Sequence, residues 1–461
     1  MLLSLEAPIL AFTLAFFSKN FTFVNGVPHY IFGENSILPA FLFMAVIVAL
    51  FLGLVISAEE IFKDRKILRR EKFLNLSRSS YLFSKISILF AISAVQTLMF
   101  VLIGNYMLEI DGMNLRYWIV LFTASCWANM IGLNISSGFN SVVTIYILVP
   151  MILVPQLLFS GVVVDFTKMH NKVARDKHVP LIGEAMASRW AYEAIAITQF
   201  RDNQFERNFY ESEKKASNAS YYRSYAIPGL IDIAADSKDL FTNNSDSFRY
   251  RNNLLVLKSE LQRICGDTRI PEPAFMDSIS LKLYNPSLNS SIKSFLNTAT
   301  LVYRSRYNSA VEERDGIYTQ MVEALGGADQ FLAFKQQYYN KQLADLLKND
   351  KEINNYSVHD GEMVPVKDAI FRDPSAESWR SHFYSPVKMF FNNKVDSYWV
   401  DLAVIWMFSG MLFILLYYDV IRRLLTYAET LRLNRLNKLR INRLLKITEQ
   451  NPLRYTRKPV K

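Results

Sequence analysis

Charged residues of both signs alternate over a short stretch between two apolar segments. Three carboxylates and four basic side chains stand out in it: Glu59, Asp64, Arg65, Arg70, Glu71, Arg78 and Lys85. Opposite charges at the ends of two neighbouring helices can form an ion-pair network, which would fix one helix end against the other. A simpler interpretation is that these charges only flank a membrane span and set its orientation, and one set of residues can do both.

The residue patterns of an enzyme do not occur in the sequence. There is no G-x-S-x-G, H-E-x-x-H or D-F-G motif, and no glycine is followed by lysine, so the phosphate-binding loop G-x-x-x-x-G-K-[ST] is missing. The five histidines are scattered, and Cys126 and Cys265 are too few for a disulfide framework or a cysteine-based zinc site. We therefore expect no catalytic residue, metal site or cofactor in this chain. If the protein uses ATP, another polypeptide or a missing segment hydrolyses it.

Six apolar segments surround these charges. A hydrocarbon core about 30 Å thick needs about 20 apolar residues in a helix. The candidate spans are Leu2–Phe17, Leu38–Ala58, Leu82–Gly104, Tyr117–Leu133, Val142–Val164 and Tyr398–Tyr418. The first is short and contains Glu6, but it lacks the basic start and the cleavage site of a signal peptide. The expected fold class is mainly α, a polytopic membrane protein with six transmembrane helices.

The chain has a formal net charge of +10, and the surplus of basic residues is concentrated next to these segments. Residues 59–81 carry seven basic and four acidic side chains, and the tail 419–461 carries twelve basic and three acidic ones. Six spans put both on one side of the membrane, which the positive-inside rule assigns to the cytoplasm. Both termini are then cytoplasmic, and the tail is expected to be an interfacial helix on anionic lipid. A partner protein or nucleic acid is the alternative for the tail, but we expect no nucleic acid.

The predicted domains are 1–164 (five spans, with a cytoplasmic coupling loop at 59–81), 165–396 (an extracytoplasmic insert), 397–418 (the sixth span) and 419–461 (the tail). The insert is expected to be mostly helical. Helical spacing runs over Glu184–Phe200 and over Ser291–Asp350, where Gly326-Gly327 divides two helices of a hairpin. Tyr210–Asn252 predicts loops with short elements, and Asn355–Pro386 predicts an irregular segment.

Three stretches resemble the membrane domain of ABC exporters of the G subfamily, the White and pleiotropic-drug-resistance type. They are the charged stretch Glu59–Lys85 with Arg78-Ser79-Ser80-Tyr81, the run Phe159-Ser160-Gly161-Val162-Val163-Val164, and the run Ser188-Arg189-Trp190-Ala191-Tyr192-Glu193-Ala194. Their order and spacing agree with that family. The resemblance covers residue 1 to about residue 200, and the last span.

The resemblance implies a permease subunit, or the membrane half, of an ATP-driven exporter that moves an amphipathic or lipid-like substrate outward by alternating access. It implies a homodimer in which Leu52, Val154 and Leu157 face the substrate cavity, and Val162 and Val163 form an apolar exit plug. It also implies that the coupling loop receives the push of an ABC nucleotide-binding domain, which holds ATP and Mg²⁺. An equal alternative is that Leu52, Val154 and Leu157 pack against helices or face lipid.

Two features depart from that family. Its ATP-binding domain normally precedes the first span, so here the ATPase is a separate chain or another part of a longer protein. The insert is also far longer than usual, and gating the exit, recognising substrate and docking an envelope protein are its candidate roles. A bacterial inner membrane is expected from the few cysteines and the large insert.

Two other classes of protein compete with the exporter. A membrane-anchored sensor or scaffold would bind a ligand or envelope partner through the insert, without transport. A membrane-embedded enzyme acting on lipid or cell-wall precursors would need His, Asp or Glu converging at one interface, and within the spans only Glu6 and Asp401 are of these types.

Overall fold

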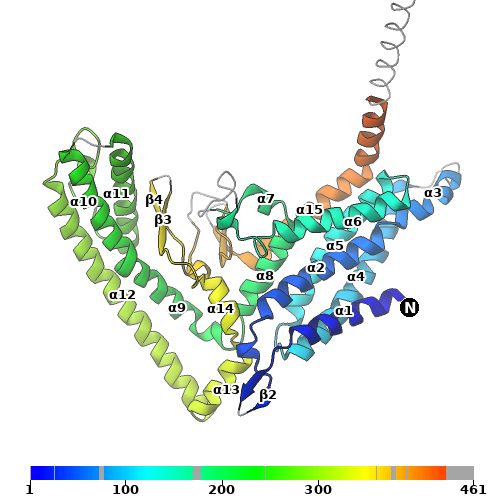
Figure 1. Ribbon diagram of the computed structural model, residues 1–461, viewed down its shortest axis with the longest axis horizontal. Coiled ribbons are helices and arrows are strands. Elements are labelled where there is room, and N and C mark those ends of the chain that lie inside the picture. The colour runs from blue at the N-terminus through cyan, green and yellow to red at the C-terminus, as the bar shows by residue number, and fades with distance from the viewer. Residues whose placement is uncertain are drawn as a thin grey trace, which may run out of the picture.

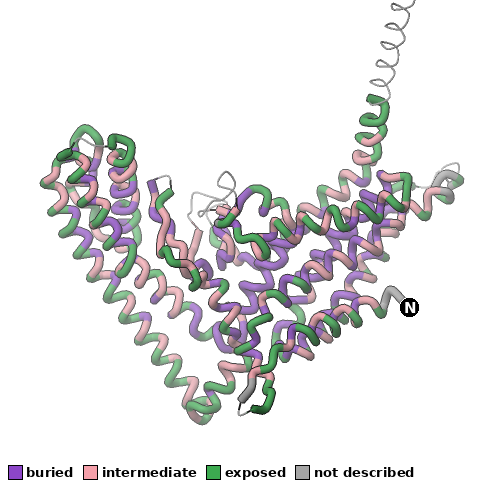
Figure 2. Tube along the Cα trace, viewed as in Figure 1, coloured by how far each residue is buried: buried purple, intermediate pink, exposed green. Residues whose placement is uncertain are grey.

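The computed structural model describes residues 2–24, 26–71, 77–169, 178–243, 246–359, 361–374, 380–390 and 393–431. This part of the chain is mainly α-helical. Figure 1 shows two arms, one of apolar helices and one of helices from the insert, which meet near α13 (Ala328–Tyr338). Buried residues run through the inside of both arms (Figure 2).

The apolar arm contains α1 (Leu2–Ser18), α2 (Leu38–Ser57), α4 (Arg78–Leu108), α5 (Asn114–Gly138), α6 (Val142–Leu158) and α15 (Ser397–Tyr417). By length and composition, four helical stretches in the described residues can cross a membrane: α4, α5, α15 and Leu38–Arg65, which joins α2 to the start of α3 (Glu60–Glu71). The helices α1 and α6 have 17 residues each. At 1.5 Å per residue that is about 26 Å, slightly less than the hydrocarbon core.

The helix α6 ends earlier than the predicted span, at Leu158 and not at Val164. The chain leaves the helical path just after it, where Gly161 adopts a φ of 82°, a left-handed conformation that favours glycine. Both Pro150 and Pro155 lie inside the helix. Only the first part of the predicted segment is therefore helical.

Small residues bring α2 and α5 into close contact. A Cβ atom added at Gly53 would collide with the carbonyl oxygen of Ser125, and one added at Gly132 would collide with the Ser57 hydroxyl. Glycine and serine at such positions let two helix backbones approach, which is how helices gain packing energy where no water is available to drive association. The backbones of α2 and α5 therefore lie closer together than a larger side chain at either glycine would allow.

Buried polar side chains connect α5 to the helices on its other sides. The Ser125 hydroxyl and the Asn129 amide each donate to the Ser93 hydroxyl of α4, at 2.9 and 2.8 Å. The Asn134 amide donates to the carbonyl oxygen of Leu412 in α15, at 2.9 Å. Such bonds add directional contacts between helices inside a membrane.

The second arm is built from α9 (Glu206–Tyr221), a π-helical segment (Tyr222–Ala226), α10 (Ile227–Thr242), α11 (Ser247–Thr268) and α12 (Leu288–Leu325). The prediction of loops over Tyr210–Asn252 is wrong, because α9, α10 and the start of α11 occupy this stretch. Two of its tyrosines are core residues: Tyr210 is 5% exposed, and Tyr222 stacks on Tyr303 of α12 with ring centroids 4.6 Å apart. Packing of aromatic rings outweighs the weak helix propensity of the Ser- and Asn-rich sequence.

At the far end of α12, the chain turns at Gly326 and Gly327, whose φ angles are 89° and 135°. Two helices follow, α13 and α14 (Lys341–Lys348), where the sequence predicted one. The break has a local cause: the Asn340 side chain accepts a hydrogen bond from the backbone N–H of Leu343 and so caps α14.

Three short antiparallel hairpins complete the described chain: β1 (Thr22–Val24) with β2 (Val27–His29), β3 (Tyr356–His359) with β4 (Glu362–Pro365), and β5 (Val387–Phe390) with β6 (Asn393–Asp396). The second hairpin lies in the stretch predicted to be irregular. The short helix α7 (Leu181–Glu184) precedes α8 (Ala187–Arg201), which packs against α2, α5 and α15. The 3₁₀ turn η1 (Phe32–Glu34) follows β2, and the 3₁₀ turn η6 (Ala369–Phe371) follows β4.

The connections between the apolar helices gather at two opposite ends. At one end, the Asn340 amide of the insert donates to the carbonyl oxygens of Phe32 and Asn35 in the α1–α2 connection, and Gln337 donates to Asp111 in the α4–α5 connection. At the other end, Arg65 of α3 contacts Asn140 in the α5–α6 connection. Arg78, at the start of α4, pairs there with Asp419, just after α15.

The α2–α5 contact predicts that Gly53→Ala lowers the free energy of unfolding by about 1–3 kcal/mol, as expected for overpacking. Thermal unfolding of the full chain in mild detergent measures the effect. The matched control is Gly410→Ala in α15, where a Cβ atom meets no other atom within 4 Å. We expect Gly410→Ala to be neutral or to stabilise by about 1 kcal/mol at most, and equal melting temperatures for the two variants would contradict the prediction.

Candidate functional site

The helix α3 is attached to α4 by an ion-pair cluster. The Lys85 ammonium group of α4 lies 2.9 Å from the Glu60 carboxylate and 2.8 Å from that of Asp64, both on α3. The Tyr81 hydroxyl donates to Asp64 at 3.0 Å. The three charged side chains are 24–30% exposed, so bulk water screens them only in part. The cluster therefore holds α3 against α4.

A second set of contacts attaches α3 to the end of α5. The Arg65 guanidinium donates to the carbonyl oxygens of Ser136 and Ser137, at 3.0 and 2.7 Å. The backbone N–H of Phe62 donates to the Ser136 hydroxyl at 2.9 Å. Arg65 thus binds carbonyl groups that the last turn of a helix leaves without an intrahelical partner. A displacement of α3 would act on both α4 and α5.

The other predicted members of the network are placed differently. Glu59 pairs with Lys63 on its own helix turn at 2.8 Å, and Arg78 pairs with Asp419 and donates to the carbonyl oxygen of Leu416 at 3.0 Å. Arg70 is exposed, and the side chain of Glu71 lies outside the described residues. The sequence analysis singled out Arg65 but missed Glu60 and Asp419 as partners. For Glu60 a signal existed, because residues four apart lie on the same face of a helix and Asp64 is four residues on.

A larger group of charges is buried where α8, β5 and α15 meet. Arg189 of α8 is fully buried and lies 3.0 Å from the Glu193 carboxylate on the same helix. Lys388 of β5 lies 2.8 Å from Glu193 and also pairs with Asp401 of α15. A longer contact of 3.5 Å joins Arg189 to Glu184, at the end of α7. Five charged groups from four elements thus share one buried site.

Aromatic and backbone groups surround these charges. The Arg189 guanidinium lies 3.9 Å and the Lys388 ammonium 4.2 Å from the ring centroid of Trp190, distances at which a cation is attracted to the ring. The other oxygen of Glu193 accepts from the backbone N–H of Tyr384 at 3.1 Å. Burial raises the pKa of the Glu184 carboxyl, and the Arg189 charge only partly opposes this.

The cluster is a structural joint between the insert and the apolar arm. Removing ions from water costs several kcal/mol each, and only mutual pairing and hydrogen bonds offset that cost. The sequence analysis noted Asp401 inside a span. It named Arg189 and Glu193 only as members of the run Ser188–Ala194 that resembles the exporter family, and predicted no ion pair for them. Lys388 was missed, because it lies almost 200 residues from Glu193 and no local pattern connects them.

The predicted cavity and plug residues lie in different environments. Leu52 is 1% exposed, so it is packed inside the single chain. Leu157 is partly buried against the apolar core, whereas Val154 is 51% exposed. After α6, Val162 is partly buried and Val163 is 53% exposed. The structure therefore does not bring all five side chains to one surface of the single chain.

The segment after α6 is supported from the insert. The Ser160 hydroxyl donates to the carbonyl oxygen of Leu157 at 2.9 Å and accepts from the backbone N–H of Val162 at 3.3 Å. Phe166 fills the space beside Gly161 and packs edge-on against Phe383, with ring centroids 5.3 Å apart. A cavity of about 180 Å³ lies between this segment and the insert, and His382 contributes to its wall.

His382 is a buried histidine with one clear partner. Its Nε2 atom lies 2.8 Å from the carbonyl oxygen of Ala369, which assigns the proton to this nitrogen. Burial, together with the nearby positive charge of Arg372, lowers the pKa of His382 from 6.5 to about 3. The imidazole is therefore neutral at physiological pH. In the described part of the chain, no group of three or more His, Cys, Asp or Glu residues is placed to hold a metal ion.

The charge cluster predicts that Lys388→Met destabilises the protein by about 3 kcal/mol or more, because it leaves buried carboxylates without their cation. Adding Asp401→Asn to Lys388→Met should recover part of the loss, since one of those carboxylates is then removed. Thermal unfolding in mild detergent measures both variants, with Lys394→Met as control, an exposed lysine paired with Asp373. A double variant no more stable than Lys388→Met alone would contradict this account.

His382 predicts a pH dependence. The unfolded chain binds a proton on this side chain below a pH of about 6.5, whereas the folded protein does so only near pH 3. Stability should therefore fall as the pH is lowered between these values. His382→Gln, whose amide can donate to the Ala369 carbonyl, should flatten this part of the unfolding profile. His29→Gln, at an exposed site, should leave the profile unchanged; equal profiles for wild type and His382→Gln would refute the assignment.

Comparison with known proteins bears on the same regions. The family model described as ABC-2 type transporter matches residues 5–200. This range runs from α1 through α8, so it contains α3, the segment after α6 and the Arg189–Glu193 pair. Neither the comparison with curated proteins nor that with solved structures gave a match.

The family match supports the expectation of an ABC transporter permease, without identifying the G subfamily. The described residues contain four helices that are long and apolar enough to cross a membrane, which agrees with an integral membrane protein. Over residues 5–200, the chain is similar to the membrane component of an ABC-2 type transporter.

Proposed function

We propose that this chain is the permease subunit, or the membrane half, of an ATP-driven exporter of the G-subfamily type. It works as a homodimer in a bacterial inner membrane and moves an amphipathic or lipid-like substrate outward by alternating access. The single observation that carries the proposal is the family match over the helices to which α3 is attached. ATP and Mg²⁺ are held by a nucleotide-binding domain, on a separate chain or on another part of a longer protein.

The contacts at the two ends of the apolar arm support six spans. The α1–α2 connection, the α4–α5 connection and the insert meet at one end, through Asn340 and Gln337. The ends of α3 and α5 and the residues after α15 meet at the other, through Arg65 and Arg78. The chain thus alternates between ends, as six crossings require. Because the basic residues gather at the second end, the positive-inside rule makes that end cytoplasmic and the insert external.

The helix α3 has the properties of a coupling element. Its inner side is held by Lys85 and by the carbonyl groups at the end of α5. Its outer side presents Arg70, which is exposed, and Lys63, whose side chain is 64% exposed. A nucleotide-binding domain that docks on this basic side can push α3, and the ion pairs transmit the push to α4.

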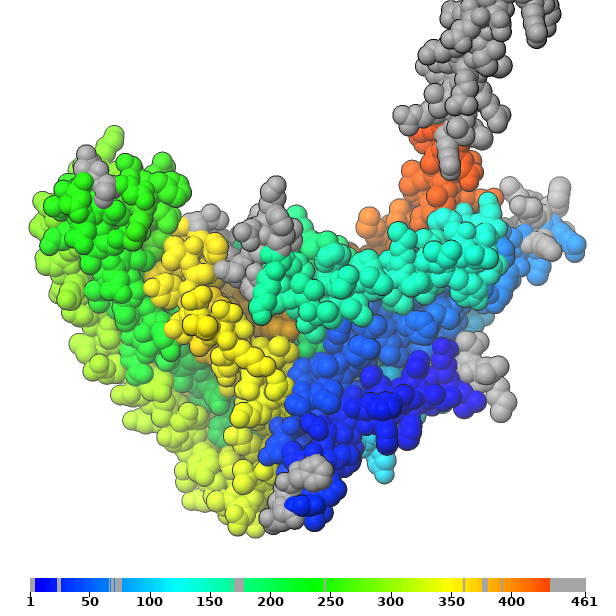
Figure 3. All heavy atoms as spheres, viewed as in Figure 1, coloured from blue at the N-terminus to red at the C-terminus, as the bar shows by residue number. Residues whose placement is uncertain are grey.

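The helix α6 offers the surface for the cavity. Five of its apolar side chains are more than half exposed and repeat at helical spacing: Val143, Tyr146, Ile147, Met151 and Val154. In the space-filling view, α6 lies at the surface of the apolar arm (Figure 3). Two copies facing each other through α6 would enclose an apolar space, which binds amphipathic molecules by about 25 cal/mol per Å² of buried apolar surface. Leu52 joins this cavity only if α2 separates from its neighbours.

The insert acts on the exit. Val162 and Val163 follow α6 at its external end, and the Phe166–Phe383 contact joins them to the insert close to the buried charge cluster. Movement of the insert therefore displaces the plug, which is the role we assign to this unusually long segment. An envelope protein bound to the insert can act by the same route.

The test is purification of the full chain from its native membrane in mild detergent, followed by an ATPase assay and identification of attached polypeptides. We expect an ATPase to accompany the wild type, and Arg70→Glu to reduce its recovery by about threefold, as for loss of an exposed ion pair. The control is Lys238→Glu, an exposed lysine on α10, which should have no effect. Wild type purified without any ATPase would favour a sensor or scaffold instead.

The internal part of the coupling path has its own test. Lys85→Asp should leave ATP hydrolysis in place but uncouple it from transport, measured in reconstituted vesicles. Combining it with Asp64→Lys restores an opposite-charge pair at the same place and should recover transport in part. If the double variant transports no better than Lys85→Asp, the ion pair does not carry the coupling.

A further inference from the structure

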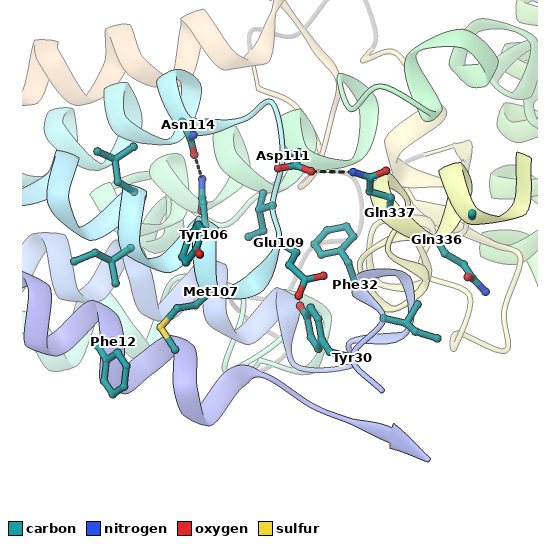
Figure 4. Close-up of a pocket in the computed structure, with 16 residues that line it drawn as sticks. Phe12, Tyr30, Phe32, Tyr106, Met107, Glu109, Asp111, Asn114, Gln336 and Gln337 are labelled. Carbon is teal, nitrogen blue, oxygen red and sulfur yellow. Dashed lines mark hydrogen bonds between the residues drawn. The ribbon is translucent and has the colours of Figure 1, made fainter. Parts of the chain in front are cut away.

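A groove of about 1050 Å³ lies away from the coupling helix and the exit plug, where α1, the end of α4, η1 and α13 meet (Figure 4). This volume is slightly above the upper end of the range of sites that hold small molecules, about 300–1,000 Å³. The apolar helices supply one part of its wall, and the connections at the external end together with the insert supply the other. Its position is thus the boundary between the apolar arm and the external segments.

The two parts of the wall differ in polarity. Phe12 of α1 and Leu102, Ile103 and Met107 of α4 form the apolar part, and Phe12 and Leu102 are about half exposed. Asp111, Asn114, Gln336 and Gln337 form the polar part. Figure 4 shows Phe12 and Met107 at one end of the labelled side chains and Gln336 and Gln337 at the other. A ligand that fills the groove must therefore be apolar at one end and polar at the other.

The polar part is acidic. Among the described residues that line the groove, Glu109 and Asp111 are the charged ones, and neither lysine nor arginine is present. Lys19, outside the lining, pairs with Glu109 at 3.0 Å. Asp111 accepts a hydrogen bond from the neutral Gln337 amide at 2.9 Å, which leaves its negative charge in place. The complementary headgroup carries an amine.

We propose that this groove binds one membrane lipid of the outer leaflet, with an amine-bearing headgroup at Asp111 and an acyl chain along Phe12 and Leu102. The proposal uses the six-span orientation given under the proposed function, but it does not require transport. The bound lipid contacts α1, α4 and α13, so it bridges the apolar arm and the insert. Two observations select this occupant. The acidic polar part complements an amine, and the apolar part lies on the helices while the polar part lies on the external connections.

The experiment uses the full chain reconstituted in lipid nanodiscs. The probes are two photoreactive lipids with the same diazirine-labelled acyl chain, one with a phosphatidylethanolamine and one with a phosphatidylglycerol headgroup. Labelled peptides are identified by mass spectrometry. We expect the ethanolamine probe to label the peptides that contain Phe12 and Leu102 in preference to other apolar helix faces.

Two pairs of variants test the two ends of the groove. Ala333→Trp on α13 should fill the groove and lower labelling by about tenfold, a loss equal to 1.4 kcal/mol. Leu332→Trp, one residue away but outside the lining, should not. Asp111→Asn should lower the preference for the ethanolamine over the glycerol probe by about threefold, the size of an exposed ion pair. Asp329→Asn, an exposed carboxylate at the start of α13, should leave the preference unchanged.

The outcomes separate this proposal from the exporter. Labelling spread evenly over the apolar helices, or equal labelling of Ala333→Trp and Leu332→Trp, overturns the lipid site and leaves the exporter untouched. Loss of the label from the groove during ATP turnover identifies transported cargo and also overturns a resident lipid. Localised, ATP-independent labelling of a chain that carries no ATPase supports the lipid site even if the exporter function fails.

Discussion

The pairing of buried charges at the junction of α8, β5 and α15 is the constraint on which the attachment of the insert to the apolar arm depends. A charged side chain without a partner in this interior would cost several kcal/mol, so the elements that carry Arg189, Lys388 and Asp401 can only be buried together. The insert is thereby fixed to the last apolar helix. It is an integral part of the fold and not an appendage between two spans.

The ends of the apolar arm are held by different chemistry. Amide and carbonyl hydrogen bonds, such as those of Asn340, join the α1–α2 connection to the insert. Charged groups join α3 to α4 and α5 at the opposite end, where Lys85 lies between two carboxylates. Between the ends, the contact of Gly53 with Ser125 keeps α2 close to α5. In the proposed exporter, the charged end receives the push of the nucleotide-binding domain and the opposite end releases the substrate.

The apolar helices and the lone charges among them were accessible to sequence reasoning, since helix length and hydropathy follow directly from the residues. The insert was not. Tyr210–Asn252 has the composition of loops but forms helices, because Tyr222 and its neighbours become core residues once they meet Tyr303 on α12. The partners of α3 were also only partly accessible: Asp64, Arg65 and Lys85 were singled out, but Glu60 and the carbonyl groups of Ser136 and Ser137 were not.

By itself, the sequence determined the number and approximate limits of the apolar segments, the side on which positive charge gathers, and the absence of a phosphate-binding loop. These are properties of composition and local spacing, which no later folding step can change. Only the tertiary structure decided which charges pair, that Leu52 is buried and Val154 exposed, and that an amphipathic groove lies between α13 and the apolar helices α1 and α4. Each of these depends on residues far apart in the chain, whose proximity is set by the joint burial of many side chains.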